Sequence, residues 1–176
     1  MGTGKTKVTV DSIAYLYESG EIDTVLIIAP KGVYENWIKN EIPKHMPDRF
    51  EKLIVKWQPN FTKKFKAEMG EVATREKRKE DRLHILVMNV EALSTSKGLE
   101  VATYYLKQNP DNMIVVDEST TIKNKGAART KAIIALGEIG KYKRILTGSP
   151  VTKSPLDLFS QCRFLHKDML GFDSYY

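Results

Sequence analysis

Short apolar runs alternate with longer amphipathic stretches along this chain, and this alternation limits the fold more than any other feature. The runs are apolar on both faces and rich in β-branched residues: 25–29, 53–55, 85–88, 113–116 and 144–147. Such runs are typical of strands that are buried on both sides of a parallel sheet. Helix-like patterns lie between them: 4–19, 33–45, 62–82, 98–109, 126–138 and 155–165. The sequence therefore predicts an α/β fold with three layers, in which helices cover both faces of a mostly parallel sheet.

The length and the cysteine count bound the domain organisation. The chain has 176 residues, which predicts one domain whose core needs neither disulfides nor a structural metal. The single cysteine, Cys162, excludes an internal disulfide and a zinc site of several cysteines, and we expect it to be a small buried apolar residue. No apolar run is long enough to span a membrane, and the N-terminus lacks the apolar core of a signal peptide. We expect an intracellular protein, cytoplasmic or nuclear, without membrane contact.

The chain is basic. It has 28 Lys and Arg against 22 Asp and Glu, a net charge of +6, and such an excess attracts polyanions, nucleic acid above all. The segment 62–82 holds eight basic and five acidic residues. It predicts a charged helix, for which two interpretations stay open. One is a solvated helix with ion pairs between residues four apart, and the other is an insertion whose basic face follows a phosphate backbone.

A glycine-rich string lies where the first helix-like pattern begins. It reads Gly2-Thr3-Gly4-Lys5-Thr6 and matches the second half of a phosphate-binding loop, whose strand and first small residue would precede the sequence. In such a loop the glycines let backbone N–H groups surround phosphate oxygens. Lys5 would reach the β- and γ-phosphates, and the Thr6 hydroxyl would bind Mg²⁺. The string therefore predicts a site for ATP and Mg²⁺.

A phosphate-binding loop needs a carboxylate from a neighbouring strand. The run 113–116 leads directly into Asp117 and Glu118, about 110 residues after the glycine-rich string. Asp117 is placed to hold Mg²⁺ and Glu118 to polarise the attacking water. An acidic turn after a strand is common, but here the two features explain each other. We predict Lys5, Asp117 and Glu118 as the catalytic residues.

These two features belong to an ordered set of motifs. Before the carboxylates, the set has Ala29-Pro30 followed by Asn36-Trp37 and Glu41, and then Asn89-Val90-Glu91-Ala92-Leu93. The carboxylates extend into Asp117-Glu118-Ser119-Thr120, which Ile122-Lys123-Asn124 follows. After them come Arg144 to Pro150, which ends in Leu-Thr-Gly-Ser-Pro, and Ser154 to Phe159 with Phe164-Leu165. In order and spacing, the set resembles the ATPase motor of Swi/Snf-type superfamily-two helicases and translocases. The resemblance covers nearly the whole chain.

The resemblance implies a RecA-like P-loop NTPase lobe, the first of two, with the second RecA-like lobe expected in the full-length protein. It implies that Thr147, Gly148 and Ser149 sense the state of the nucleotide. It also places a further set of residues on nucleic acid: Pro30, Lys31, Asn36, Asn89 and Lys123. The partner it implies is DNA, with a duplex favoured and RNA not excluded. The implied function is ATP hydrolysis coupled to movement on duplex DNA, although this incomplete lobe alone is expected to be inactive.

One position departs from the family pattern. Thr120 stands where relatives have His or Asp, a position that contacts the third motif and couples hydrolysis to strand movement. Two rival functions stay open. A nucleotide kinase or GTPase lacks support because we find neither an Asn-Lys-x-Asp motif nor an acceptor lid. The second rival is a nucleic-acid-binding module whose phosphate loop no longer hydrolyses ATP. Both tryptophans, Trp37 and Trp57, are expected to be core residues.

Overall fold

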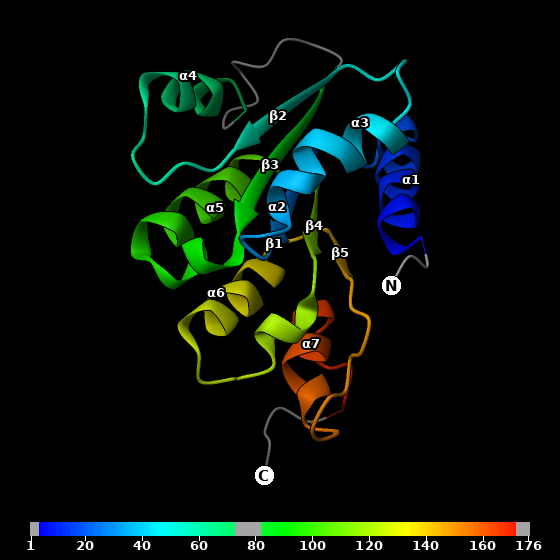
Figure 1. Ribbon diagram of the computed structural model, residues 1–176, viewed down its shortest axis with the longest axis vertical. Coiled ribbons are helices and arrows are strands. Elements are labelled where there is room, and N and C mark those ends of the chain that lie inside the picture. Colours follow the sequence, from blue (N-terminus) through cyan, green and yellow to red (C-terminus); the bar gives the residue numbers. More distant parts are fainter. Residues whose placement is uncertain (1–3, 73–81, 172–176) are drawn as a thin grey trace.

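The computed structural model describes residues 4–72 and 82–171 and shows a sheet between two layers of helices (Figure 1). The strands are β1 (Thr24–Ala29), β2 (Lys52–Lys56), β3 (Leu83–Asn89), β4 (Asn112–Val116) and β5 (Tyr142–Ile145). The α-helices are α1 (Lys5–Glu18), α2 (Tyr34–Asn36), α3 (Ile42–His45), α4 (Lys63–Val72), α5 (Ser96–Gln108), α6 (Ala128–Gly137) and α7 (Asp157–Leu165). Shorter turns are the π-helix η1 (Trp37–Glu41) and the 3₁₀ helices η3 (Val90–Ser94) and η4 (Ser119–Ile122).

The five strands form one parallel sheet in the order β2-β3-β1-β4-β5. The central strand β1 pairs with β3 and β4, so that Ile28 lies beside Met88 on one side and Val116 on the other. All six residues of β1 are buried, because helices cover the strand on both faces. The predicted three-layer α/β fold with a parallel sheet is therefore confirmed.

Two apolar clusters fill the spaces between the layers. Helices α1 and α3 with η1 cover one face, where Ile13 and Trp37 pack against Val25 and Ile27 of β1. Helices α4 to α7 cover the other face, where Tyr105 and Phe164 pack in the same cluster as Leu26. Successive residues of a strand point to opposite faces of the sheet, so the apolar residues of the strands belong alternately to the two clusters.

The helix predicted at 33–45 is confirmed as a continuous helical stretch over 34–45, although its middle is the π-helix η1. One predicted strand boundary is wrong in detail. The run at 144–147 begins as a strand earlier, at Tyr142, and ends at Ile145, because β5 pairs with β4 from Met113 to Val116 and β4 stops there. Thr147 consequently lies in a loop. Cys162 is only partly buried, whereas Trp37 and Trp57 are core residues as predicted.

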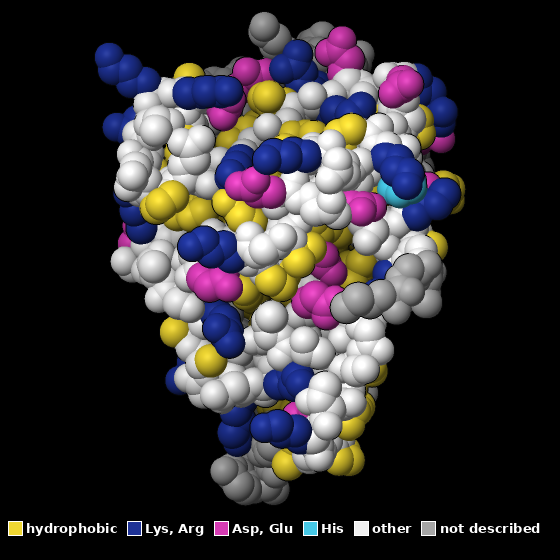
Figure 2. Space-filling model, in the orientation of Figure 1, with side chains coloured by type: hydrophobic (Ala, Val, Ile, Leu, Met, Phe, Trp, Pro, Cys, Tyr) yellow, Lys and Arg dark blue, Asp and Glu magenta, His cyan; other side chains and the backbone are white. Residues whose placement is uncertain are grey.

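The charged segment is a helix in its described part, α4, while residues 73–81 lie outside the described residues. Lys64 Nζ lies 3.7 Å from Glu68 Oε1, one turn along the helix. On the face drawn in Figure 2, Lys and Arg side chains are spread widely, with acidic side chains among them. The basic side chains on this face are thus dispersed and not gathered into one patch.

Candidate nucleotide and nucleic-acid site

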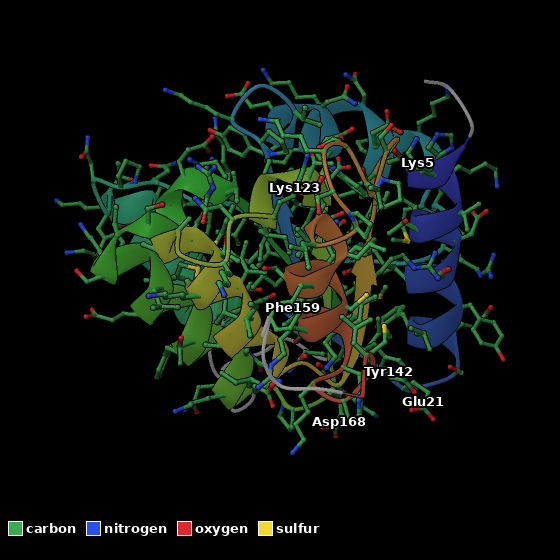
Figure 3. The ribbon with its side chains drawn as sticks, turned by 90° about the horizontal axis from the view of Figure 1, so that it is seen from below. Lys5, Glu21, Lys123, Tyr142, Phe159 and Asp168 are labelled. Carbon is green, nitrogen blue, oxygen red and sulfur yellow. The ribbon has the colours of Figure 1, made fainter. Side chains whose placement is uncertain are left out.

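Helix α1 brings the glycine-rich string to the carboxyl edge of the sheet. It leads through a short turn into β1 and packs against that strand, so the two run in opposite directions and Lys5 lies beyond the strand ends. Figure 3 shows Lys5 at one end of α1 and Glu21 beyond the other end. Gly2 and Thr3 lie outside the described residues. Ligands of open parallel sheets bind at this carboxyl edge.

The start of α1 is suited to an anion. Gly4 takes the left-handed conformation, with φ 76°, just before the helix begins, and the first turn carries no acidic side chain. A Cβ added to Gly4 would meet nothing within 4 Å, so backbone conformation and not space favours glycine here. The first N–H groups of α1 and the positive end of its dipole are available to phosphate oxygens. Thr6 is half-buried in this first turn.

A pocket of about 420 Å³ joins this helix start to the loop after β5. Its lining includes Lys5 and Thr9 from α1 together with Leu146, Thr147 and Pro150. The string at the N-terminus and the third motif, about 140 residues later, therefore share one pocket. The Thr147 hydroxyl accepts a hydrogen bond from the Ser149 N–H at 3.1 Å, which shapes the loop, while Gly148 and Ser149 are exposed.

Asp117 lies at the end of β4 with its carboxylate held from two sides. Its Oδ1 accepts the N–H of Glu118 at 2.9 Å, and its Oδ2 accepts the indole N–H of Trp37 at 2.8 Å. The Asp117 N–H donates to Ile28 O at 2.8 Å, which continues the β1–β4 ladder by one residue. The Asp117 side chain is thereby fixed where the parallel strands end, next to β1.

Glu118 adopts a conformation that side chains avoid. Its φ of 48° and ψ of 59° lie in the left-handed region, which costs a non-glycine residue about 1 kcal/mol or more. Such conformations occur mostly where the surrounding structure enforces them, and they cluster at active sites. Here the Ser119 N–H donates to Leu146 O at 2.9 Å, which holds the chain after Glu118 against the end of β5.

The donor set at this edge fits Mg²⁺ and a nucleotide. An ammonium group (Lys5) and helix N–H groups suit phosphates, while a hydroxyl (Thr6) and carboxylates (Asp117 and Glu118) are the oxygen ligands that Mg²⁺ prefers. Among residues 4–72 and 82–171, no group of three or more His, Cys, Asp or Glu is arranged so that it could hold a metal ion. Mg²⁺ in a nucleotide site does not need one, since one or two carboxylates complete a shell of phosphates and water.

Gln161 of α7, which the sequence did not single out, joins the carboxylate motif to the third motif. It is fully buried, and its Oε1 accepts the Ser119 hydroxyl at 2.6 Å. Its Nε2 donates to Pro150 O and to Asp157 O, both at 2.8 Å. Thr120, the predicted coupling residue, is half-buried. Two side chains of the segment 117–124 donate hydrogen bonds to the region 150–161: Ser119 donates to Gln161, and Lys123 donates to Thr152.

Asp157 organises the loop before α7. Its Oδ2 accepts the N–H groups of Thr152 and Lys153, at 2.8 and 2.9 Å, and also the Thr152 hydroxyl at 2.9 Å. These bonds, the backbone N–H of Lys153 first, lower the pKa of Asp157 to about 2. The Lys123 ammonium bonds the Thr152 hydroxyl and lies 3.9 Å from the same carboxylate oxygen. Lys123, predicted to bind nucleic acid, is thus engaged with this loop.

The other residues predicted on nucleic acid lie at or near the carboxyl edge. Pro30 follows β1 and Asn89 ends β3, and Ala29 and Asn89 are register partners, so these two segments are neighbours. Lys31 is exposed. The Asn89 amide donates to Glu91 at 3.0 Å and the Asn36 amide to Glu41 at 2.9 Å. The structure therefore brings the segments together, with both amides bonded to nearby carboxylates.

Comparison with known proteins identifies the family of this chain. The model of the SNF2-related domain matches residues 1–176. The chain belongs to the SNF2-related domain family. Among its relatives is the "Probable ATP-dependent DNA helicase CHR23" of Arabidopsis thaliana, 33% identical over 94% of this chain and 14% of that protein. Another is the "Chromatin-remodeling ATPase INO80" of Aspergillus oryzae, 29% identical over 99% of this chain and 11% of that protein.

A solved SNF2 structure shares the fold. The "Sulfolobus solfataricus SWI2/SNF2 ATPase core in complex with dsDNA" superposes with a TM-score of 0.67 at 27% identity, over 98% of this chain and 31% of that one. The predicted Swi/Snf resemblance and the RecA-like lobe are thereby confirmed. The chain spans only a seventh or less of the curated relatives named above. Within the described residues, no helix is both long and apolar enough to cross a membrane.

Proposed function

We propose that this chain is the ATP-binding first lobe of an ATP-dependent DNA helicase or translocase of Swi/Snf type, which couples hydrolysis to movement on duplex DNA. The observation that carries the proposal is the shared carboxyl edge. Lys5 at the start of α1 lines one pocket with Thr147, and the Leu146 carbonyl beside it accepts the N–H that follows Asp117 and Glu118. In a chain of the SNF2-related domain family, this arrangement supports a site for a nucleoside triphosphate.

In this proposal each residue has a separate task. The N–H groups after Gly4 and the Lys5 ammonium bind phosphate oxygens, while Thr6 and Asp117 hold Mg²⁺, which supplies charge neutralisation when bound. Glu118, held in its left-handed conformation, orients the attacking water. Thr147, Gly148 and Ser149 form the loop that responds to the nucleotide, and Thr120 keeps its predicted coupling role.

The proposed partner is duplex DNA, along a path over Pro30, Lys31, Asn36, Asn89 and Lys123. The similar Sulfolobus solfataricus ATPase core forms a complex with double-stranded DNA, which supports a duplex over RNA. The exposed Lys31 and the dispersed basic side chains of Figure 2 favour weak, sequence-independent binding through phosphates. A second RecA-like lobe would complete the channel in the full-length protein. The site of action is then any compartment that holds DNA, nuclear or cytoplasmic.

Nucleotide binding tests the proposal with a matched pair of variants. A fluorescent ATP analogue is titrated with Mg²⁺ into the wild-type chain, Lys5→Ala and Lys7→Ala. Lys7 lies on the same helix but is exposed and paired with Asp11 at 2.6 Å, so its removal controls for charge. We expect Lys5→Ala to weaken binding about 10- to 100-fold, the value of a charge-assisted hydrogen bond, and Lys7→Ala to leave it unchanged. Equal effects of the two substitutions would refute the proposed site.

Nucleic-acid binding is tested by titrating labelled duplex DNA and duplex RNA at two salt concentrations. We expect weak binding of DNA whose affinity falls steeply with salt, because each phosphate that the chain neutralises releases counterions and adds about −0.9 to the logarithmic salt slope. Binding that does not depend on salt would contradict the phosphate path. Equal affinity for RNA would remove the preference for DNA. Nucleic-acid binding by a chain that binds no nucleotide would favour the rival function, a binding module without hydrolysis.

A further inference from the structure

Trp37 contacts the carboxylate that the nucleotide site depends on. Its side chain is only 1% exposed, and its Nε1–H donates to Asp117 Oδ2 at 2.8 Å, across 80 residues of sequence. A buried tryptophan usually pairs its indole N–H with some acceptor, and the choice of acceptor is the informative part. This one does so on a carboxylate expected to hold Mg²⁺.

The place of Trp37 along the chain adds a second observation. It is the first residue of η1, a π-helical turn, and it directly follows Asn36. π-Helical turns are rare, and those that occur are frequently found at functional sites. The same stretch, from Pro30 to Glu41, is the one we propose to lie along the DNA. A single side chain thus connects the DNA-facing segment to the carboxylate.

The chemistry of the indole suits a positioning role. Indole N–H is a donor only, so it can fix a carboxylate without competing for the metal. An ionised carboxylate has about four lone-pair sites, and the N–H groups of Trp37 and Glu118 use one on each oxygen. The remaining lone pairs stay free for Mg²⁺ or for its water ligands, and their directions are set by the two donors.

We propose that Trp37 is a positioning residue that orients the Asp117 carboxylate for Mg²⁺, and that through it contact of DNA with residues 30–41 acts on the nucleotide site. This inference rests on the proposed function, since it gives the link between the two ligands of that function. Groups that orient a metal ligand in this way are worth about 10- to 100-fold in metal affinity when they are removed.

The first test measures the Mg²⁺ requirement of nucleotide binding. Trp37→Phe keeps an aromatic ring in the core but removes the donor. Trp57→Phe is the matched control, because Trp57 is 5% exposed and packs edge-to-face with Phe61 and Phe65 in the cluster on the opposite face of the sheet. Binding of the fluorescent ATP analogue is followed against free Mg²⁺ and in EDTA for each variant, and thermal unfolding reports whether each is folded.

We expect Trp37→Phe to need about tenfold more free Mg²⁺ for half-maximal binding, with unchanged affinity in EDTA. Trp57→Phe should match the wild-type chain. An unchanged Mg²⁺ requirement in Trp37→Phe, or an equal change in both variants, would overturn the inference and leave the proposed function standing. If the wild-type chain binds no nucleotide at any Mg²⁺ concentration, the proposed function falls and the inference with it.

The second test needs no substitution at Trp37. The chain has two tryptophans, so its ¹⁵N NMR spectrum has two indole N–H signals, which Trp57→Phe assigns. We expect the Trp37 signal to move when Mg²⁺ and nucleotide are added, and to move again on adding duplex DNA, while the Trp57 signal stays in place. A Trp37 signal that is indifferent to bound Mg²⁺-nucleotide would overturn the positioning role. A Trp37 signal that does not change when DNA binds would overturn the proposed connection between DNA contact and the nucleotide site.

Discussion

The two halves of the proposed nucleotide site are built in different ways. The carboxylate half is fixed by side chains: Asp117 by Trp37, and Ser119 by Gln161, all of them buried. The phosphate half is a helix start, in which Gly4 is exposed and the groups offered to the ligand are backbone N–H groups and the Lys5 ammonium. One half is thus oriented by tertiary packing before any ligand binds, whereas in the other the left-handed backbone at Gly4 sets the start of the helix.

The largest predicted effect concerns hydrolysis by this chain alone. Orientation of Asp117 and Glu118 does not supply the arginines that the second RecA-like lobe is proposed to contribute, and such groups are worth about 10³–10⁵ in rate. We therefore expect negligible phosphate release at saturating Mg²⁺-ATP and duplex DNA, and recovery of turnover when the second lobe is added. A colorimetric phosphate assay measures both. Appreciable turnover by the chain alone, abolished by Lys5→Ala, would show that a fixed carboxylate half is sufficient.

The next effect concerns the buried hydrogen bonds of the carboxylate half. Gln161→Leu leaves the buried Ser119 hydroxyl without its acceptor and removes the donor to the carbonyl of the exposed Pro150. A buried polar group left unpaired costs about 1–3 kcal/mol. We expect a loss of this size in the free energy of unfolding, measured in urea. Gln108→Leu, at an exposed position on α5, is the control and should be nearly neutral.

A double variant decides whether these bonds act together. If Ser119→Ala is added to Gln161→Leu, the combined loss should be smaller than the sum of the two single losses, because both substitutions remove the same hydrogen bond. Additive losses would mean that the hydrogen bond between Ser119 and Gln161 contributes nothing to stability.

Gln161 also shows where prediction from the sequence ends. The apolar runs predicted the layers and the parallel sheet because hydrophobic periodicity is local, and the motifs placed Lys5, Asp117 and Glu118 at one edge because parallel strands end together. Gln161 and the Trp37–Asp117 bond carry no such local signal. Each joins residues 42 or 80 positions apart, and only packing decides which polar atoms meet. The π-helical turn at Trp37 has no local signal either, since its sequence is that of an ordinary amphipathic helix.

A smaller effect is expected in the phosphate half. Gly4→Ala puts a side chain at φ 76°, where nothing obstructs the added Cβ but the left-handed backbone costs about 1 kcal/mol. Gly32→Ala is the matched control, since its Cβ also meets nothing within 4 Å and its φ lies outside the left-handed region. We expect urea unfolding to show the loss only for Gly4→Ala, together with weaker nucleotide binding. Equal behaviour of the two variants would mean that Gly4 is not held in its left-handed conformation.

The smallest expected effect is a pH dependence at the outer rim of the carboxylate half. Hydrogen bonds from Lys153 and Thr152 lower the pKa of Asp157 from 3.8 to about 2 in the folded chain. The stabilisation that this brings is present above pH 4, where the unfolded chain also carries the charge, and it is lost as the pH falls toward 2. Asp157→Asn removes the titrating group, so its unfolding free energy should change less between pH 4 and pH 2 than that of the wild-type chain.

Glu35→Gln is the reference variant for this pH dependence. The Lys56 and Lys39 ammonium groups lower the pKa of Glu35 to about 2, so this carboxylate titrates in the same window as Asp157. Both substitutions should therefore flatten the acid limb of stability, but of the two carboxylates only Asp157 bonds the loop at 152–153. We expect Asp157→Asn, and not Glu35→Gln, to speed limited proteolysis of that loop at neutral pH. If Asp157→Asn keeps both the wild-type cleavage rate and the full pH dependence, then this carboxylate does not stabilise the loop, and the fixed part of the carboxylate half ends at Gln161.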